Sequence, residues 1–393
     1  MAIRAFRSLL ANLQKRRRTS RRRSQRRAFQ KQLGRQRAHE PLEARVLLSG
    51  SQLTWQEGAP YVFDDGYGNL VGVMPLAPGE SWQAGAPASG ELMAPYPLAD
   101  TFLLHSNPGA SKVIYLDFDG HITTGTPWNA STGVDPIVTP AYDRDGNPNV
   151  FSDAELREIQ LAFDMVAEDF RPFDVNVTTQ DPGIEALRNS GGGDNRWGIR
   201  AVIGPDVAGM GAGGWAYVGS FDWNSDVPAF VFNAGPKAMP ETVSHEVGHT
   251  LGLRHDGSPT QEYYPGHGAG PTGWAPIMGV GFSRELVQWS RGEYPGANNQ
   301  EDDLAIITTR NGFGYRADDH GNSMITASPL DVSDTFSVSA EGIIERTADV
   351  DYFVFETGYG PVSLSIDPFY RSPNLTASNL TTTAPAVLKS VLA

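Results

Sequence analysis

The residues of this chain that could do chemistry are concentrated in one short segment, HEVGHTLGLRHD, which begins at His245. His245 and His249 are four positions apart, so on a helix both imidazoles project from one face, about one turn apart. Glu246 is placed to reach a water molecule on a bound metal. Gly252 lets the chain leave the helix, and the turn brings His255 round as a third ligand. Three neutral imidazoles and one open position predict a catalytic zinc site, because a structural site is closed by four protein ligands.

The segments before these histidines indicate the elements that must position them. Ser152 and Glu155 have capping-box spacing and open a helical pattern that stops at Pro172. Pro240 suits a first helical turn, which predicts that the histidine helix runs from about Pro240 to Leu251. Five β-prone stretches are predicted as strands: 112–118, 174–179, 200–203, 214–221 and 229–233.

This order of strand, helix, four strands and histidine helix resembles the upper subdomain of the metzincin zinc peptidases, over about residues 111–310. Met278 resembles the methionine turn that lies below the zinc ligands in that family, and an ordinary core methionine is the alternative. The resemblance implies an α+β, zincin/metzincin-like catalytic domain at 108–314, with a mixed twisted sheet and an active-site helix. Val280 stands where astacin-like members carry a tyrosine, so no tyrosine ligand is expected at that position.

The resemblance also implies the reaction. A metal-activated water would attack the scissile carbonyl of a peptide, and Glu246 would act as the general base that returns the proton to the leaving amine. Gly252, Asp256 and Met278 are expected to support the site from below without binding the metal. One catalytic zinc ion is the implied cofactor.

Substrate recognition is expected at the fourth predicted strand. In metzincins the edge strand of the sheet pairs with the peptide backbone, which is a form of strand addition. Residues 214–220 are the candidate for that edge strand, and an interior strand is the alternative. The substrate-binding residues would be Gly214, Trp215, Ala216 and Tyr217. The loop 279–282 is expected to form a wall of the pocket just past the scissile bond.

Charge is distributed unevenly along the 393 residues. The first 45 residues hold 15 Lys+Arg and 2 Asp+Glu, a net charge of +13, and the rest holds 16 and 43, a net charge of −27. An acidic body repels the nucleic-acid backbone, which argues against a nucleic-acid partner. The chain has no cysteine, which excludes disulfides and thiolate sites. No stretch reaches the roughly 18 apolar residues of a membrane span, so no transmembrane segment is expected.

The basic start of the chain runs into PLEARVLLSG at 41–50, which resembles the LEPR-XLL motif of planctomycete-type surface and exported proteins. Ala44 stands where that motif has proline. The resemblance implies a secreted or cell-surface protein with a disordered leader at 1–50; a nucleic-acid arm or a chance cluster after a basic tail are the alternatives. Residues 51–107 are rich in Gly and Pro and are interpreted as a loosely folded pre-region or a prosegment, since metzincins are often made as zymogens.

The end of the chain, 315–393, resembles the start of a pre-peptidase C-terminal (PPC) domain, a β-sandwich appended to secreted peptidases. Short alternating stretches predict strands at 342–345, 349–355 and 361–366. The later strands of that family are missing, so a small, incomplete β-sandwich is expected.

Calcium is a second candidate ion. Asp349 and Asp351 match an acidic stretch of the PPC pattern, and ordinary turn carboxylates are the alternative. The loop 143–149 spaces its oxygens like an EF-hand but lacks the glycine and the bidentate glutamate, which favours a polar turn.

These patterns together predict an exported zinc metalloendopeptidase that acts on protein or peptide substrates. Two alternatives are a surface adhesion or matrix protein with an incidental or inactive protease domain, and a metal-dependent amidase acting on cell-wall peptides. The intact set of His245, Glu246, His249 and His255 argues against an inactive domain.

Overall fold

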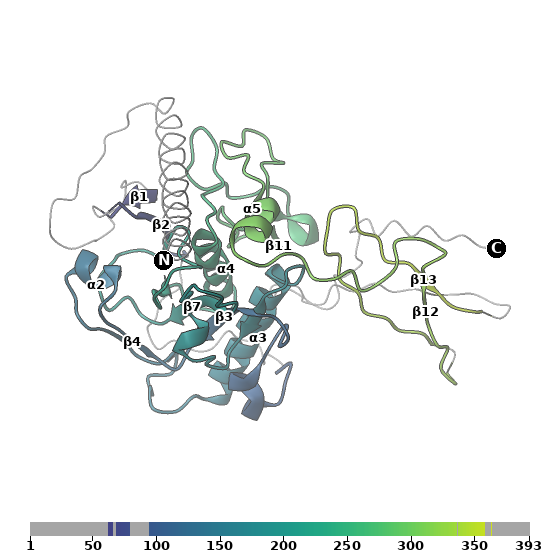
Figure 1. Ribbon diagram of the computed structural model, residues 1–393, viewed down its shortest axis with the longest axis horizontal. Helices are drawn as coiled ribbons and strands as arrows, with labels where there is room; N and C mark the ends of the chain where they lie inside the picture. Colours follow the sequence, from purple (N-terminus) through teal and green to yellow (C-terminus); the bar gives the residue numbers. More distant parts are fainter. Residues whose placement is uncertain (1–61, 66–67, 79–93, 336, 358–362, 364–393) are drawn as a thin grey trace, which may run out of the picture. The chain divides into compact units, whose positions relative to one another are not determined.

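The computed structural model describes residues 62–65, 68–78, 94–335, 337–357 and 363, so the predicted leader at 1–50 lies outside the described residues. A seven-stranded sheet in the order β1-β2-β8-β9-β7-β3-β6 organises the fold (Figure 1). Its strands are β1 (Val62–Asp64), β2 (Leu70–Met74), β3 (Lys112–Asp117), β6 (Asn176–Thr178), β7 (Trp197–Ile203), β8 (Gly214–Tyr217) and β9 (Ala229–Val231). The five strands predicted from the sequence are all present, and the strand predicted at 214–221 is shorter than expected.

The sheet is mixed. Strands β9, β7, β3 and β6 pair in parallel. Strands β8, β2 and β1 pair antiparallel with their neighbours. A mixed sheet with few helices confirms the expected mixture of helix and strand and is consistent with a metallopeptidase domain.

Two long helices cover one face of the sheet, α3 (Asp153–Asp169) and α4 (Ala238–Thr250). Ser152 caps α3 as predicted: the Glu155 carboxylate accepts from the Ser152 backbone N–H at 2.7 Å, and the Ser152 hydroxyl accepts from the Glu155 N–H. Apolar side chains of both helices share a core with β3, including Ile159, Val247 and Ile114. Helix α4 begins two residues before the predicted Pro240.

The opposite face carries a second apolar cluster, built around Trp128 on the short helix α2 (Pro127–Thr132). Trp128 packs on Tyr217 of β8, with the ring centroids 4.1 Å apart. The side chains of Val71 and Val73 in β2 belong to this cluster, and both are fully buried. Strand β2 is therefore part of the core.

Shorter elements complete the described chain: η1 (Leu98–Leu103), β4 (His121–Thr123), β5 (Ile137–Thr139), η2 (Ile184–Ala186), η3 (Gly270–Thr272), β10 (Trp274–Pro276), β11 (Leu286–Gln288) and α5 (Asp303–Arg310). Among the described helices, none combines the length and the apolar character that crossing a lipid bilayer requires.

Two expectations about the pre-region and the edge strand are wrong. The stretch 51–107 was expected to be loosely folded, yet it contributes β2 to the central sheet. Strand β8 was expected at an edge, yet it lies between β2 and β9. The physical reason is the same for both, because the alternating valines of β2 bury their side chains when the strand pairs with β8.

The C-terminal part differs from the expected sandwich. Its described strands are β12 (Ser328–Pro329) and β13 (Phe353–Val354), which pair in parallel. Residues 342–345 form no strand, and most of the predicted strand 361–366 lies outside the described residues. Isoleucine and valine side chains in this region are largely exposed, including Ile325 and Val350, so alternation alone does not create a buried face here.

Candidate metal centre

Helix α4 places the first two histidines on one buried face. The ring centroids of His245 and His249 lie 4.8 Å apart, as their spacing predicts. The helix ends at Thr250, Leu251 caps it, and Gly252 follows with a φ of 98°, a left-handed conformation that disfavours residues with a Cβ. The chain turns there, and the ring centroid of His255 comes to 4.7 Å from that of His249.

Each histidine ring is held by its Nδ1 atom. Nδ1 of His245 lies 2.9 Å from the Ile277 carbonyl oxygen, and Nδ1 of His249 lies 3.0 Å from the Leu253 carbonyl oxygen. Nδ1 of His255 lies 3.0 Å from the Glu262 carboxylate. Carbonyl oxygens only accept hydrogen bonds, and a carboxylate also accepts, so each Nδ1 donates and each Nε2 is left with a lone pair.

The Nε2 atoms converge on one another. The ligand atoms of all three histidines lie within 4.8 Å of one another, and Nε2 of His249 is 2.9 Å from Nε2 of His255. Two lone pairs at that distance repel unless a cation lies between them. Nε2 of His245 has no hydrogen-bond partner among the described residues. Zinc fits this donor set, because imidazole nitrogen is one of its preferred ligands.

Burial also selects the metal-binding form of these rings. It lowers the pKa of His245 and His249 well below the usual value of 6.5, and it lowers the pKa of His255. A neutral imidazole is the form that binds a metal, so the site is ready for one without the loss of a proton at neutral pH.

Glu246 points into the same site from the helix. Its side chain is fully buried, and neither carboxylate oxygen has a hydrogen-bond partner among the described residues. Burial raises its pKa well above 4.5. A buried carboxylate without partners costs free energy, which is typical of groups kept for chemistry.

The floor of the site is formed by Met278, which is fully buried. It packs under Gly248, where an added Cβ would lie 2.5 Å from the methionine Sδ. The backbone N–H of Asp256 donates to the Met278 carbonyl at 2.8 Å, which ties the turn after His255 to the floor. Burial raises the pKa of the Asp256 carboxyl to about 7.

The four residues proposed to bind substrate, Gly214, Trp215, Ala216 and Tyr217, form β8 beside Glu246. A Cβ on Gly214 would lie 2.6 Å from Oε1 of Glu246, so the glycine lets the strand approach the carboxylate closely. The side chains of Trp215 and Tyr217 point to the other face of the sheet, into the Trp128 cluster.

Sequence reasoning missed Tyr263 and Glu262. The Tyr263 ring centroid is 4.5 Å from that of His255, and its hydroxyl donates a hydrogen bond to the Val73 carbonyl oxygen. Both residues lie in a loop after the motif, where no periodicity links them to the histidines. An acidic residue soon after the third histidine was the one available signal for a partner of His255.

Two acidic clusters outside this centre bring carboxylates together. Asp143 lies with Asp145 and Glu155, and Asp318 lies both with Asp319 and Glu345 and with Asp349 and Asp351. In the first cluster, Oδ1 of Asp143 accepts the backbone N–H of Gly146 at 2.7 Å, which is the geometry of a polar turn. Calcium binding at either cluster remains a prediction.

Comparison with known proteins agrees with this geometry. Residues 184–256 match a family model described as metallo-peptidase family M12B, reprolysin-like. The matched stretch ends at Asp256 and contains Glu246 and the three histidines. No curated protein matches the chain. The family match and the histidine cluster support a zinc-dependent metalloprotease in general.

Proposed function

We propose that this protein is a zinc-dependent endopeptidase whose catalytic domain spans about residues 108–314. The observation that carries the proposal is the set of three buried imidazoles, each held through Nδ1 with Nε2 turned inward, beside a carboxylate without partners. His245, His249 and His255 would hold the zinc ion. Bound zinc would supply an activated water molecule and polarise the scissile carbonyl.

Side chains of the protein carry out proton transfer, charge stabilisation and positioning of the ligands. Glu246 accepts a proton from the attacking water and delivers it to the leaving amine, because its buried carboxylate has no competing hydrogen-bond partner among the described residues. The Tyr263 hydroxyl, which donates to the Val73 carbonyl in the structure, would donate to the carbonyl oxygen on which negative charge develops. Asp256 and Met278 keep the turn with His255 in position.

The test is metal analysis combined with peptide hydrolysis. The purified protein is expected to hold one zinc per chain and to hydrolyse casein or a fluorogenic peptide library, with a chelator abolishing the activity. Peptidoglycan is the comparison substrate. Protein that holds zinc and acts on cell-wall peptides alone would replace endopeptidase with amidase, and protein without stoichiometric zinc would overturn the proposal.

We also propose that the protein is exported, as a secreted or surface-associated enzyme. Support comes from the LEPR-XLL-like segment at 41–50 and the acidic remainder of the chain. Detection of the full chain in fractionated cells tests this. Protein confined to the cytoplasm would contradict the proposal without affecting the assignment of the zinc site.

A further inference from the structure

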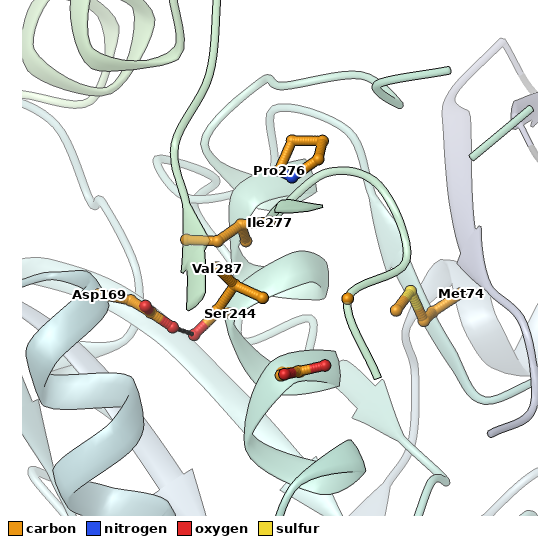
Figure 2. A pocket seen from close by; sticks show the side chains of 8 residues that line it. Met74, Asp169, Ser244, Pro276, Ile277 and Val287 are labelled. Carbon is orange, nitrogen blue, oxygen red and sulfur yellow. Dashed lines mark hydrogen bonds between the residues drawn. The ribbon is translucent and has the colours of Figure 1, made fainter. Parts of the chain in front are cut away.

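A pocket lies beside the metal centre, lined by helix α4 and by the loop 279–282 that the sequence predicts as a pocket wall (Figure 2). Ser244 contributes to the lining from the helix and Gly281 from the loop. Ser244 precedes His245 in the chain, and Ile277, which also lines the pocket, holds the His245 ring through its carbonyl oxygen. A peptide bound at the metal centre would therefore have a side chain within reach of this pocket.

The pocket combines apolar walls with polar groups. Its apolar walls are formed by four side chains: Met74, Pro276, Ile277 and Val287. Its polar groups are the Ser244 hydroxyl and the carboxyls of Asp169 and Glu241. Figure 2 shows Asp169 and Met74 on opposite sides of the pocket. Such a lining suits one side chain that has an apolar stem and a polar tip.

Asp169 is a carboxyl in an electrostatically unfavourable position. It is the last residue of α3, where the partial negative charge of a helix C-terminus disfavours an anion. Its neighbour Glu168 pairs with Arg171 at 2.6 Å, and Glu241 pairs with Lys237. No salt bridge among the described residues reaches Asp169. Its negative charge is therefore left unbalanced when it ionises.

Two hydrogen bonds hold Asp169 at the pocket. Its Oδ2 atom accepts from the Ser244 hydroxyl at 2.6 Å, and its backbone carbonyl accepts from the Trp289 indole N–H at 2.7 Å. The second carboxyl oxygen, Oδ1, is left to accept from a ligand.

The surroundings of Asp169 disfavour its charged form. Burial raises its pKa to about 8, and the carboxylates of Glu241 and Glu168 add to the rise. The Ser244 hydroxyl and the Lys237 ammonium oppose it. A cation at Oδ1 would stabilise the carboxylate and reverse this shift.

We propose that this pocket takes the side chain of the residue after the scissile bond and that Asp169 selects lysine there. The aliphatic stem of lysine would lie against Ile277 and Val287, and its ammonium would pair with Oδ1 of Asp169. Because Ser244 already uses Oδ2, one free oxygen suits the compact ammonium better than the bidentate guanidinium of arginine. The inference rests on the proposed peptidase function and names its substrate class.

The first measurement is binding, which needs no hydrolysis. Lysine amide, norleucine amide and arginine amide mimic the residue that follows the cleaved bond, and norleucine has the lysine stem without the ammonium. Titration calorimetry on the zinc-loaded full chain should show lysine amide binding roughly 10- to 150-fold more tightly than norleucine amide, and more tightly than arginine amide.

Two variants locate this preference. Asp169→Asn keeps an acceptor for the Ser244 hydroxyl and removes the charge, so lysine amide and norleucine amide should bind alike. Asp164→Asn is the matched control on the same helix, because the Asp164 carboxylate accepts from the Tyr96 hydroxyl at 2.7 Å and does not line the pocket. It should keep the preference for lysine. Zinc content and Tm are measured for both variants.

The second measurement is hydrolysis of fluorogenic peptides that differ only in the residue after the cleaved bond. The ratio of kcat/KM for lysine over norleucine cancels the pH effects that both peptides share. Asp169 ionises as the pH rises through its pKa of about 8, whereas lysine stays charged up to about pH 10. The ratio should therefore rise by up to about tenfold from pH 7 to pH 9, and it should stay constant in Asp169→Asn.

The outcomes separate this inference from the proposed function. Equal binding of lysine and norleucine amides to the unsubstituted chain, tighter binding of arginine amide, or a lysine preference that survives in Asp169→Asn would overturn the inference, whatever the activity. If Asp169→Asn loses its fold or its zinc, the three amides on the unsubstituted chain at pH 7 and pH 9 still decide it. Lysine-selective binding that depends on Asp169, with no peptide hydrolysed, would keep the pocket assignment and refute the peptidase function instead.

Discussion

Removal of the Tyr263 hydroxyl tests the centre most sharply, because it should loosen strand β2 and also slow the proposed reaction. In the structure this hydroxyl donates to the Val73 carbonyl. Its loss in Tyr263→Phe removes one hydrogen bond, worth about 0.5–1.5 kcal/mol, that holds β2 in place. The amides of β2 and of its partner β8 should therefore exchange roughly 2- to 13-fold faster than in the unsubstituted protein.

The turnover rate kcat, in contrast, should fall in Tyr263→Phe. With β2 displaced, the same hydroxyl donates to the substrate carbonyl as negative charge develops on its oxygen. Loss of one such donor lowers kcat by about 10²- to 10³-fold, with little change in KM, because the interaction strengthens in the transition state. The zinc content of each variant is measured alongside, so that loss of metal is not mistaken for this effect.

Tyr264→Phe is the matched control. The Tyr264 hydroxyl lies 3.1 Å from Nδ1 of His267, and its ring stacks on Tyr294 with centroids 4.1 Å apart. This substitution makes the same chemical change one residue along, and it should leave kcat within about twofold. If Tyr263→Phe also left kcat within twofold, or raised KM alone, Tyr263 would not be a donor to the reacting carbonyl and the reasoning would fail.

Three further predictions concern the carboxylate, the floor and the histidines. Glu246→Gln should lower kcat/KM by about 10²- to 10⁴-fold with zinc content unchanged. Loss of zinc from this variant would instead make Glu246 a ligand. Gly248→Ala should lower the free energy of unfolding in urea by about 1–3 kcal/mol, because its Cβ would lie 2.5 Å from Met278 Sδ. Gly314→Ala is the control, since a Cβ there would have nothing within 4 Å, and it should change this free energy by under about 0.5 kcal/mol. Burial lowers the pKa of all three histidines, so protons compete with zinc for them only below the usual value of 6.5. The zinc dissociation constant should therefore be constant between pH 6.5 and pH 8 and should increase in more acidic solution. A steep increase of this constant already at neutral pH would contradict the prediction.

The zinc-ligand set could be predicted because its information is local. Two histidines four positions apart on one helix must share a face, and a glycine after the helix permits the turn to the third. The cap of α3 at Ser152 is local for the same reason. The strands at 112–118 and 229–233 were found because alternating or apolar runs indicate strands without regard to their partners.

Other features depend on pairing between distant segments. Strand β2 pairs with β8, which lies about 140 residues later in the chain, and the alternation of Val71 and Val73 does not predict which strand is the partner. The edge position predicted for β8 was wrong for this reason, since a strand is an edge only if no distant segment pairs with it. The pre-region was expected to be loose because its composition is Gly- and Pro-rich, and composition does not reveal one well-placed strand.

The histidine motif by itself determined that a metal could be bound and which carboxylate would stand beside it, since spacing along a helix sets those directions. Tertiary structure alone decided that Tyr263 and Glu262 reach His255 and that Gly72 covers His249. Contacts of this second kind arise when loops and strands far apart in sequence are packed into one core. Local spacing does not predict these contacts, because the free energy that stabilises them comes from burial across the whole domain.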